Sequence, residues 1–354
     1  MNNTHNRFSL RGLLPAAAIA LGLAAAGCAK PVTTSTGEWS QEYLDLWMAQ
    51  YHPGVQQQPS GIYILEDQPG TGALWNAEIP YTYASSTIRT LSGTVSSTND
   101  ENLSKQLGTY AMGNYYGPHF QTTGDGYSYA GVDAMLEGMR MGGTRTAVIP
   151  AWLLNSTRQE SRQAYMDACS SASSLIYTIH LAGQCEDLEQ MEKDSLKNYV
   201  LHQLKNTVPI STYADKEQDG SFYFLSLGHP DGAEERGETE SMRLHYTGRL
   251  LNGQVFDTTN EKVAKDAGIW ASGNTYATVS IGFASDWSSI TLDGSSSLID
   301  GFKGALSLMK YPGEKAYALF TSTHGYSYSG SGNRIPAYSP LFFELELLPA
   351  EEEE

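Results

Sequence analysis

The residue types that usually carry out covalent or metal chemistry are thinly spread in this sequence. Three cysteines and eight histidines occur among 354 residues, and the histidines form no HxxH or HExxH pair. The chain has no GxSxG turn, no Walker-type phosphate loop and no GxGxxG after a predicted strand. Acidic residues are abundant, yet no pair is set apart by its spacing as a general acid and base. We therefore predict no metal, no cofactor and no covalent catalysis.

Two of the cysteines, Cys169 and Cys185, lie in the middle of the chain. In an oxidising compartment such a pair can form a disulfide, but their spacing in sequence does not show that they are close in space. A disulfide and two separate thiols both remain open. Neither cysteine has a histidine at metal-ligand spacing, which argues against a zinc site.

The segment that most clearly indicates a specialised site runs from Leu244 to Thr259. Its sequence, LHYTGRLLNGQVFDTT, predicts two strands joined by a turn at Asn252-Gly253, because Asn-Gly is a strong hairpin signal. The two strands carry a tyrosine, a phenylalanine and an aspartate near a glycine. An aromatic site beside one carboxyl group suits binding and electrostatic work more than nucleophilic attack.

This hairpin resembles the signature of the FK506-binding protein (FKBP) family, in which a His-Tyr-Thr-Gly strand leads through a glycine turn to Phe-Asp. Further segments resemble that family in the same order: Leu298–Phe302, Tyr326–Tyr328, Ile335-Pro336 and Leu341–Leu348. They are similar to its helix start, its tyrosine-bearing loop and its final strand. The resemblance covers about residues 222–348 and implies an antiparallel sheet half-wrapped around one short α-helix, with an apolar pocket between them.

The resemblance implies a peptidyl-prolyl cis-trans isomerase, with pocket residues carried over position by position. Those implied to be catalytic are Tyr246, Phe256, Asp257, Ile299, Phe302, Tyr328 and Phe343, and Leu298 and Ile335 are implied to bind substrate. Taken singly, aromatic residues on strands more often belong to an ordinary core. An aspartate after a strand can simply cap a turn. The joint order of these residues favours the functional interpretation.

The sequence departs from the family pattern at several places. Phe302 stands where tryptophan is usual, Ser329 replaces a glycine, and Ala337 replaces a proline. An insertion at residues 264–287 carries Trp270, Tyr276, Phe283 and Trp287. It could close over the pocket or extend it, and the sequence does not decide between these two arrangements.

A repeated pattern predicts that the domain occurs twice. Ala130–Arg140 and Asp300–Lys310 share Gly, Leu, Met and a basic residue at identical offsets, with apolar residues at helical spacing. A glycine turn and a strand-like run follow each stretch, and a further strand closes each copy. The fold class predicted is α+β, with two tandem FKBP-like domains.

The first copy lacks much of the pocket signature. Tyr83 is aligned with Tyr246 and Tyr129–Val132 with the helix start, but Val95–Ser97 stands where Phe-Asp is expected. After Ile149-Pro150 the chain enters a mostly polar stretch, residues 152–174, without the loop tyrosine. We therefore expect the first copy to be catalytically silent and to serve in binding, as a chaperone or in dimer formation.

The N-terminus resembles a bacterial lipoprotein signal peptide. Arg7 and Arg11 precede an apolar stretch, residues 13–26, that is too short to span a bilayer as a mature helix. Ala25-Ala26-Gly27-Cys28 resembles the lipobox, in which the cysteine is lipidated. The alternative is an ordinary signal peptide with an incidental cysteine. We expect lipidation at Cys28, a membrane anchor and a location in the bacterial cell envelope, facing the periplasm.

Five segments are predicted along the chain. They are a signal peptide (1–28), a tether with a short helix capped by Ser40 (29–60), a degenerate FKBP-like domain (61–182), a connecting helix (183–206) and an isomerase domain (207–350). The formal net charge of −17 comes without any basic cluster, which excludes nucleic acid as a partner. The closing Glu351–Glu354 run is expected to be a solvated tail.

The predicted function is prolyl isomerisation by the second copy, which would assist the folding of exported polypeptides. The expected partners are proline-containing unfolded chains and the membrane, and a homodimer through the first copy is one candidate assembly. The alternative is a lipoprotein that binds unfolded chains without turnover. Exposed tyrosines and tryptophans also leave open a carbohydrate-binding surface lipoprotein.

Overall fold

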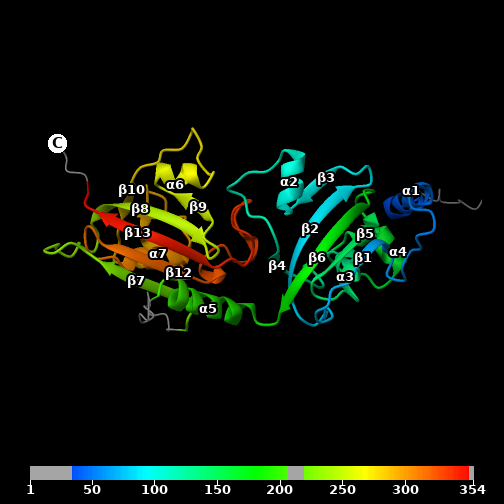
Figure 1. Ribbon diagram of the computed structural model, residues 1–354, viewed down its shortest axis with the longest axis horizontal. Coiled ribbons are helices and arrows are strands. Elements are labelled where there is room, and N and C mark those ends of the chain that lie inside the picture. Colours follow the sequence, from blue (N-terminus) through cyan, green and yellow to red (C-terminus); the bar gives the residue numbers. More distant parts are fainter. Residues whose placement is uncertain (1–33, 206–218, 351–354) are drawn as a thin grey trace, which may run out of the picture. The chain divides into compact units, whose positions relative to one another are not determined.

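The computed structural model describes residues 34–205 and 219–350 and contains two similarly built halves (Figure 1). We call residues 34–185 the first half and residues 186–350 the second half. Each half consists of one antiparallel sheet and a short helix against it. The predicted α+β class with two sheet-plus-helix domains is therefore confirmed.

The elements of the first half follow the predicted alternation of strands and short helices. They are α1 (Thr36–Tyr51), β1 (Tyr63–Gln68), β2 (Tyr81–Thr90), β3 (Val95–Thr98), α2 (Glu101–Leu107), β4 (His119–Thr122), α3 (Ala130–Leu136), β5 (Gly143–Ile149), η1 (Ala151–Leu153), α4 (Arg162–Asp167) and β6 (Leu175–Cys185).

The second half repeats this order with two additional turns and a short strand. Its elements are α5 (Leu188–Asn198), η2 (Tyr199–Gln203), β7 (Phe222–Gly228), β8 (Ser241–Leu250), β9 (Val255–Thr258), α6 (Glu261–Asp266), β10 (Val279–Gly282), η3 (Trp287–Ser289), β11 (Thr291–Leu292), α7 (Asp300–Leu308), β12 (Lys315–Phe320), η4 (Ser322–His324), η5 (Ser327–Ser329) and β13 (Leu341–Leu348).

The two sheets share a six-strand topology, and the second adds β11 beside β10. The first runs β1-β5-β6-β2-β3 with β4 also paired to β2, and the second runs β7-β12-β13-β8-β9 with β10 also paired to β8. All of these strand pairs are antiparallel. In each half, the long strand β2 or β8 presents one edge to two short strands, one at each end of that edge.

The helices α3 and α7 pack on their sheets through the residues that the sequence repeat predicted. The predicted apolar positions are buried: Val132, Leu136, Met139, Phe302, Leu306 and Met309. The close approach requires glycine, since a Cβ at Gly301 would lie 2.5 Å from the Phe320 ring. Gly131 has the same relation to Ile149 at 2.2 Å. Substitution at either glycine would push the helix off the sheet.

A second helix covers the opposite face of each sheet. In the first half α1 buries Leu44 and Met48 against Tyr63 and Val148. In the second half α5 and η2 do the same with Leu196 and Val200, which pack against the strand residues Tyr223, Leu225, Leu319 and Phe342. The helix predicted as a connector is thus the counterpart of α1 and opens the second repeat.

The start of α1 differs from the prediction. Ser35 is the N-cap, and its side chain accepts a hydrogen bond from the Glu38 amide in a capping box. Ser40, the predicted cap, lies inside the helix and is buried, with its hydroxyl donating to the Gly37 carbonyl at 2.7 Å. Both serines precede apolar residues, but only Ser35 has glutamate three positions later.

The insertion predicted for the second half has a counterpart in the first. In each half a short helix, a loop and a strand follow the hairpin: α2 and β4 in one, α6 and β10 in the other. The loops share a Gly-Asn-x-Tyr pattern, at residues 113–116 and 273–276. Tyr116 accepts from the Ala111 amide at 3.0 Å, and Tyr276 accepts from the Ala271 amide at 2.9 Å. The insertion therefore belongs to the repeat.

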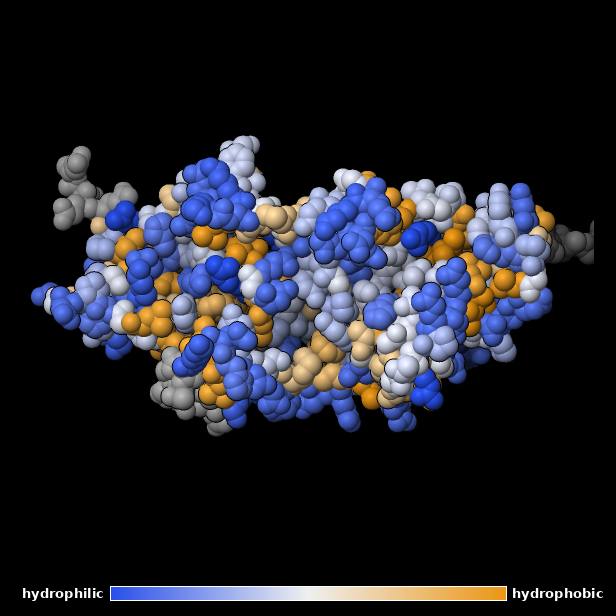
Figure 2. All heavy atoms as spheres, in the orientation of Figure 1, coloured by the Kyte–Doolittle hydropathy of each residue, from blue (hydrophilic) through white to orange (hydrophobic). Residues whose placement is uncertain are grey.

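Several further expectations can be compared with the described residues. Cys169 and Cys185 are both free, so the disulfide is not formed. None of the helices in residues 34–205 and 219–350 is long and apolar enough to cross a membrane. The signal peptide, Cys28 and Glu351–Glu354 lie outside the described residues. Figure 2 shows a mainly hydrophilic face with hydrophobic residues in separate areas.

Candidate active site

The site is built on the β8–β9 hairpin, as the sequence predicts. Gly253 turns the chain at φ 90°, and Gly248 pairs with Asp257 across the ladder. A Cβ at Gly248 would lie 2.4 Å from the Phe256 ring and 3.0 Å from the Phe343 ring. The glycine is therefore needed so that the Phe256 ring can cover the strand and meet Phe343.

Four aromatic rings meet above the middle of the sheet. Phe343 of β13 lies 4.8 Å from Phe302, 5.5 Å from Phe256 and 6.4 Å from Tyr246 between ring centroids. Tyr246 also meets Phe302 edge-on at 5.5 Å. Such tilted and edge-to-face arrangements are favourable for aromatic pairs. The phenylalanine rings are buried and Tyr246 is half-buried, and we call this group of four rings the aromatic wall.

A hydrogen bond links the aromatic wall to the carboxyl group. The Tyr246 hydroxyl donates to Asp257 Oδ2 at 2.8 Å, while the Thr258 amide donates to Asp257 Oδ1 at 2.9 Å. Burial, followed by the charge of Asp257, raises the pKa of Tyr246. Tyr246 therefore stays a neutral donor across the physiological pH range, and Asp257 is an exposed carboxylate at the edge of the apolar surface.

The start of α7 supplies the next part of the wall. Ile299 is the N-cap residue of α7 and packs with Leu298 against the core that contains Phe302. Phe302 is 4% exposed. A phenylalanine is thus buried at the position where the family pattern has tryptophan.

The loop between β12 and β13 brings one predicted residue to the cluster and leaves another outside it. Ile335 is buried in the core, but Tyr328 is 73% exposed. Tyr326 packs against the cluster instead, and burial followed by the charge of Asp257 raises its pKa. The Arg334 guanidinium donates to the Phe256 carbonyl at 3.1 Å and ties the loop to β9.

The insertion neither covers nor fills this aromatic wall as a single unit. Phe283 belongs to the second-half core and Trp287 packs against it. Tyr276 packs instead with Val255, Ala264 and Ile269 in a separate small cluster. Trp270 is 44% exposed. β10 pairs along β8, so this part of the insertion extends the sheet, which is neither of the two arrangements weighed from the sequence.

Strand register identifies the equivalent positions in the first half. Thr87 pairs with Thr98 as Thr247 pairs with Thr258. By this register the counterpart of Tyr246 is Ser86, so the predicted alignment with Tyr83 was wrong by three residues. The other counterparts are Ile88 for Gly248, Ser96 for Phe256, Ser97 for Asp257, Val132 for Phe302 and Tyr177 for Phe343.

At the first-half positions equivalent to the aromatic cluster, Ser86, Val132 and Tyr177 line part of an open hollow, together with Tyr129. Burial raises the pKa of Tyr177 to about 12. The segment that begins at Trp152 was predicted to be polar, but Trp152 is buried and donates its ring N–H to Gln41 at 2.8 Å.

A curated protein is similar to part of the chain. No family model matches the chain. Over 125 residues the chain is 26% identical to the macrophage infectivity potentiator of Trypanosoma cruzi, a match that covers 35% of this chain and 50% of that protein. The match therefore spans only half the length of this curated relative.

Two solved structures are also similar. The three FKBP domains of wheat FKBP73 match at 16% identity, over 83% of this chain and 97% of that one, with a TM-score of 0.28. A peptidyl-prolyl cis-trans isomerase from Pseudomonas syringae pv. tomato matches at 20% identity, over 47% and 94% of the two chains, with a TM-score of 0.29.

The chain thus contains two α+β domains with one repeated strand order and a helix on each sheet, and a stretch of 125 residues is similar to half of the Trypanosoma cruzi protein.

Proposed function

We propose that the second half is a peptidyl-prolyl cis-trans isomerase that acts on proline-containing polypeptides. The observation that supports this most directly is the aromatic wall of Tyr246, Phe256, Phe302 and Phe343, edged by the Asp257 carboxylate. An apolar wall with one acceptor at its rim suits a pyrrolidine ring and the amide that precedes it.

The chemistry needs no nucleophile. Rotation about an X-Pro bond is slow because amide resonance opposes it with a barrier of about 18–20 kcal/mol. The twisted amide has lost resonance, so its oxygen and nitrogen are less charge-separated than in the planar form. A water-poor aromatic surface therefore favours the twisted state over the planar one, which is selective binding of the transition state.

The polar residues at the rim orient the peptide. Tyr246 stays protonated and is held by Asp257, and the negative carboxylate would bias the rotating carbonyl away from itself. Tyr328 has an exposed hydroxyl that can donate to a substrate carbonyl when the peptide lies along the loop. Holding the peptide in one orientation lowers the barrier further.

A prolyl tetrapeptide isomerisation assay on the mature chain tests the proposal. We expect a rate well above the uncatalysed rate for the wild type, a large loss in Phe256→Ala and a smaller loss, of roughly threefold to tenfold, in Asp257→Ala. The matched first-half variants Ser96→Ala and Ser97→Ala should keep the wild-type rate. A wild-type rate equal to the thermal background would remove the isomerase assignment.

We further propose that the protein is a lipoprotein of the bacterial cell envelope, anchored through Cys28 and facing the periplasm. The support is the lipobox-like Ala25–Cys28 sequence after a short apolar stretch. Cells given a labelled fatty acid should label the wild-type protein and not Cys28→Ser. A labelled Cys28→Ser protein, or an unlabelled wild type, would contradict the anchor.

For the first half we propose binding of unfolded polypeptide without turnover. The open hollow favours this, because serines and a valine stand where the second half has its tight aromatic wall. Its hydroxyls and the exposed Tyr127 and Tyr129 can contact main-chain and aromatic groups of varied chains.

An aggregation assay tests this proposal. Aggregation of a reduced, unfolded client protein should be suppressed equally by the wild type and by Phe256→Ala. Suppression that disappears with Phe256→Ala would assign binding of the client to the second half. Binding to a glycan array without any suppression of aggregation would favour carbohydrate as the ligand.

A further inference from the structure

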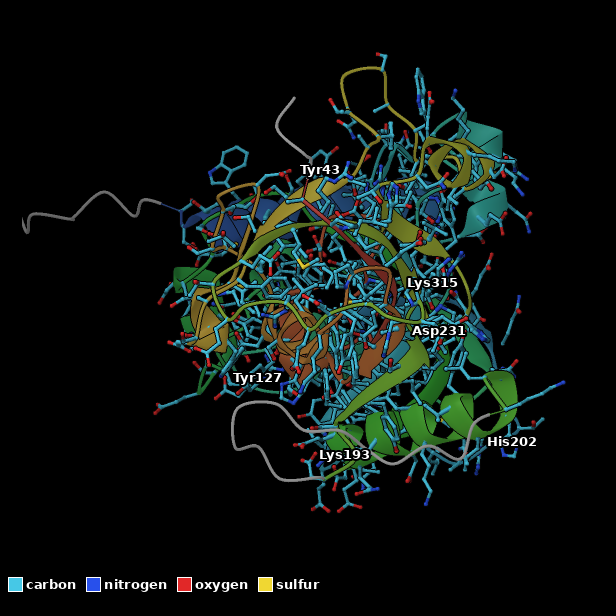
Figure 3. The ribbon with its side chains drawn as sticks, turned by 90° about the vertical axis from the view of Figure 1, so that its left-hand side faces the viewer. Tyr43, Tyr127, Lys193, His202, Asp231 and Lys315 are labelled. Carbon is cyan, nitrogen blue, oxygen red and sulfur yellow. The ribbon has the colours of Figure 1, made fainter. Side chains whose placement is uncertain are left out.

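The helix that opens the second half carries a buried carboxylate. Glu192 of α5 is 2% exposed, although its neighbours Glu189 and Lys193 form an ion pair at the surface. Figure 3 labels Lys193 on α5 and His202 on η2, which directly follows α5. A buried carboxylate is costly unless strong donors satisfy it. The cost of burying Glu192 must therefore be offset by the groups that bind its carboxylate.

Both oxygens of Glu192 bind a single residue, Ser322. The Ser322 amide donates to one oxygen at 2.6 Å, and the Ser322 hydroxyl donates to the other at 2.8 Å. This is a bidentate, charge-assisted contact between residues 130 positions apart. Burial raises the pKa of Glu192 to about 7, while the two donors from Ser322 oppose the rise.

Ser322 is the first residue of η4, and η4 begins the loop that carries Tyr326, Tyr328 and Ile335. The other end of this loop is tied down by Arg334, which binds the Phe256 carbonyl. The segment between these two ties contains a left-handed residue, Ser327, with φ 50°. The Ser327 carbonyl also accepts a hydrogen bond from the Tyr338 amide at 2.8 Å, so this residue is held from the far end of the loop as well.

In the first half the residue at the position of Ser322 is held without a charged side chain. Strand register makes Ala151 the counterpart of Ser322, and the Ala151 amide donates to the Ser174 hydroxyl at 3.1 Å. By the packing of Leu44 and Leu196, the position equivalent to Glu192 is Ser40, which bonds within its own helix. The carboxylate tie thus occurs in the half that carries the aromatic wall.

We propose that Glu192 is a positioning residue for the isomerase site: by holding Ser322, it sets the loop whose tyrosines border the aromatic wall. The inference rests on the proposed isomerase activity. It also implies that a working fragment of the second half must include α5 and cannot begin at residue 207.

The test uses the mature chain with Glu192→Ala, Glu192→Gln and, as a matched control on the same helix, Glu189→Ala. Without the tie the loop is displaced, so we expect kcat/KM for a prolyl tetrapeptide to fall roughly tenfold in Glu192→Ala. In Glu192→Gln the amide oxygen can accept from the Ser322 amide and the amide nitrogen can donate to the Ser322 hydroxyl oxygen, so this variant should recover most of the rate. Glu189→Ala should match the wild type.

Amide hydrogen exchange provides a readout that does not depend on activity. In Glu192→Ala, amides of residues 322–335 should exchange roughly tenfold faster, with β8 and β13 unchanged. If Glu192→Ala does not fold, Ser322→Ala removes only the hydroxyl contact and should give a smaller change in the same direction. Unchanged exchange and kcat/KM would overturn the proposal. Loop exchange that changes while the wild type shows no isomerase activity would instead overturn the proposed function.

Discussion

The two halves share a strand order but differ at the same few positions above the sheet. In the second half a glycine on β8 leaves room for Phe256, and four rings and a carboxylate gather there. In the first half Ile88 occupies the glycine position, and Ser86, Ser96 and Ser97 replace the tyrosine, phenylalanine and aspartate. The scaffold is therefore independent of the aromatic wall.

This difference separates the residues that build the fold from those that build the site. Helix residues such as Leu136 and Leu306 are buried alike in both halves. Gly131 and Gly301 are both needed for contact between helix and sheet. The residues that differ lie on the sheet face next to the start of the helix. Changes there should alter activity more than they alter topology.

The largest effect is expected from Phe343→Ala, because the Phe343 ring lies within 6.4 Å of Tyr246, Phe256, Phe302 and Phe320. Removing a buried phenylalanine costs about 3–5 kcal/mol, and isomerase activity should fall to background. Denaturant unfolding and the tetrapeptide assay measure the two effects. Tyr177→Ala, at the equivalent first-half position, should destabilise the first half and keep the activity. Loss of activity in both variants would mean that the halves do not act separately.

The sequence was sufficient to predict the parts of this comparison that depend on local patterns. The hairpin at Asn252-Gly253, the helix of residues 300–308 and the strand of residues 341–348 all follow from turn chemistry and periodicity. The aromatic residues Phe256, Phe302 and Phe343 also meet as the resemblance implied.

Other features depend on register and on contacts that sequence patterns do not specify. The sequence makes Tyr83 the predicted counterpart of Tyr246, whereas pairing of β2 with β3 puts Ser86 at that position. The loop motif predicts Tyr328 at the pocket, but the structure leaves Tyr328 exposed and packs Tyr326 against the core. The repeated Gly-Asn-x-Tyr pattern at 113–116 and 273–276 could have revealed that both halves contain the insertion.

The next largest expected effect is a pH dependence of the free energy of unfolding, which distinguishes Glu192 from Ser40, its counterpart in the first half. A carboxyl group whose pKa is about 7 in the folded protein, compared with 4.5 for an ordinary glutamate, binds more protons in the native state between these values. Stability is therefore highest at low pH within this window and falls as pH rises toward 7, by at most about 3 kcal/mol. Glu189, one turn earlier, adds like charge in the same direction.

Unfolding by urea at several pH values between 4.5 and 8 measures this dependence. The difference in free energy of unfolding between the wild type and Glu192→Gln should decrease as the pH rises toward 7, because glutamine does not titrate. Ser40→Ala should show no such pH-dependent difference. A pH-independent difference for Glu192→Gln would mean that the carboxyl group titrates at its ordinary pKa.

A smaller effect is expected from exchanging Gly248 of the second half with Ile88, its counterpart in the first half. Gly248→Ile places a branched side chain against Phe256 and Phe343, where even a Cβ would be too close. Overpacking of this kind costs about 1–3 kcal/mol, and displacement of Phe256 should lower kcat/KM more than tenfold. The reverse change in the first half, Ile88→Gly, should leave kcat/KM unaltered. Equal activity in Gly248→Ile and wild type would show that the Phe256 ring is not part of the site.

The smallest effect is expected where a single hydrogen bond is removed. Tyr246→Phe keeps the ring and loses the donor to Asp257 Oδ2, and Asp257→Ser introduces the first-half residue and loses the acceptor. Hydrogen bonds to charged groups contribute about 1.5–3 kcal/mol when buried. Asp257 is exposed, so we expect the lower end or less, a fall in kcat/KM of roughly threefold to tenfold for each variant.

The double variant separates two roles for Asp257. If Asp257 acts only by orienting Tyr246, Tyr246→Phe and Asp257→Ser should each cost as much as the pair, because both remove the same contact. If Asp257 also acts on the rotating carbonyl, Asp257→Ser should lower kcat/KM further in the Tyr246→Phe background. Additive losses without any coupling would show that the 2.8 Å bond between Tyr246 and Asp257 plays no part in catalysis. In that case the carboxylate alone would distinguish the rim of the second half from that of the first.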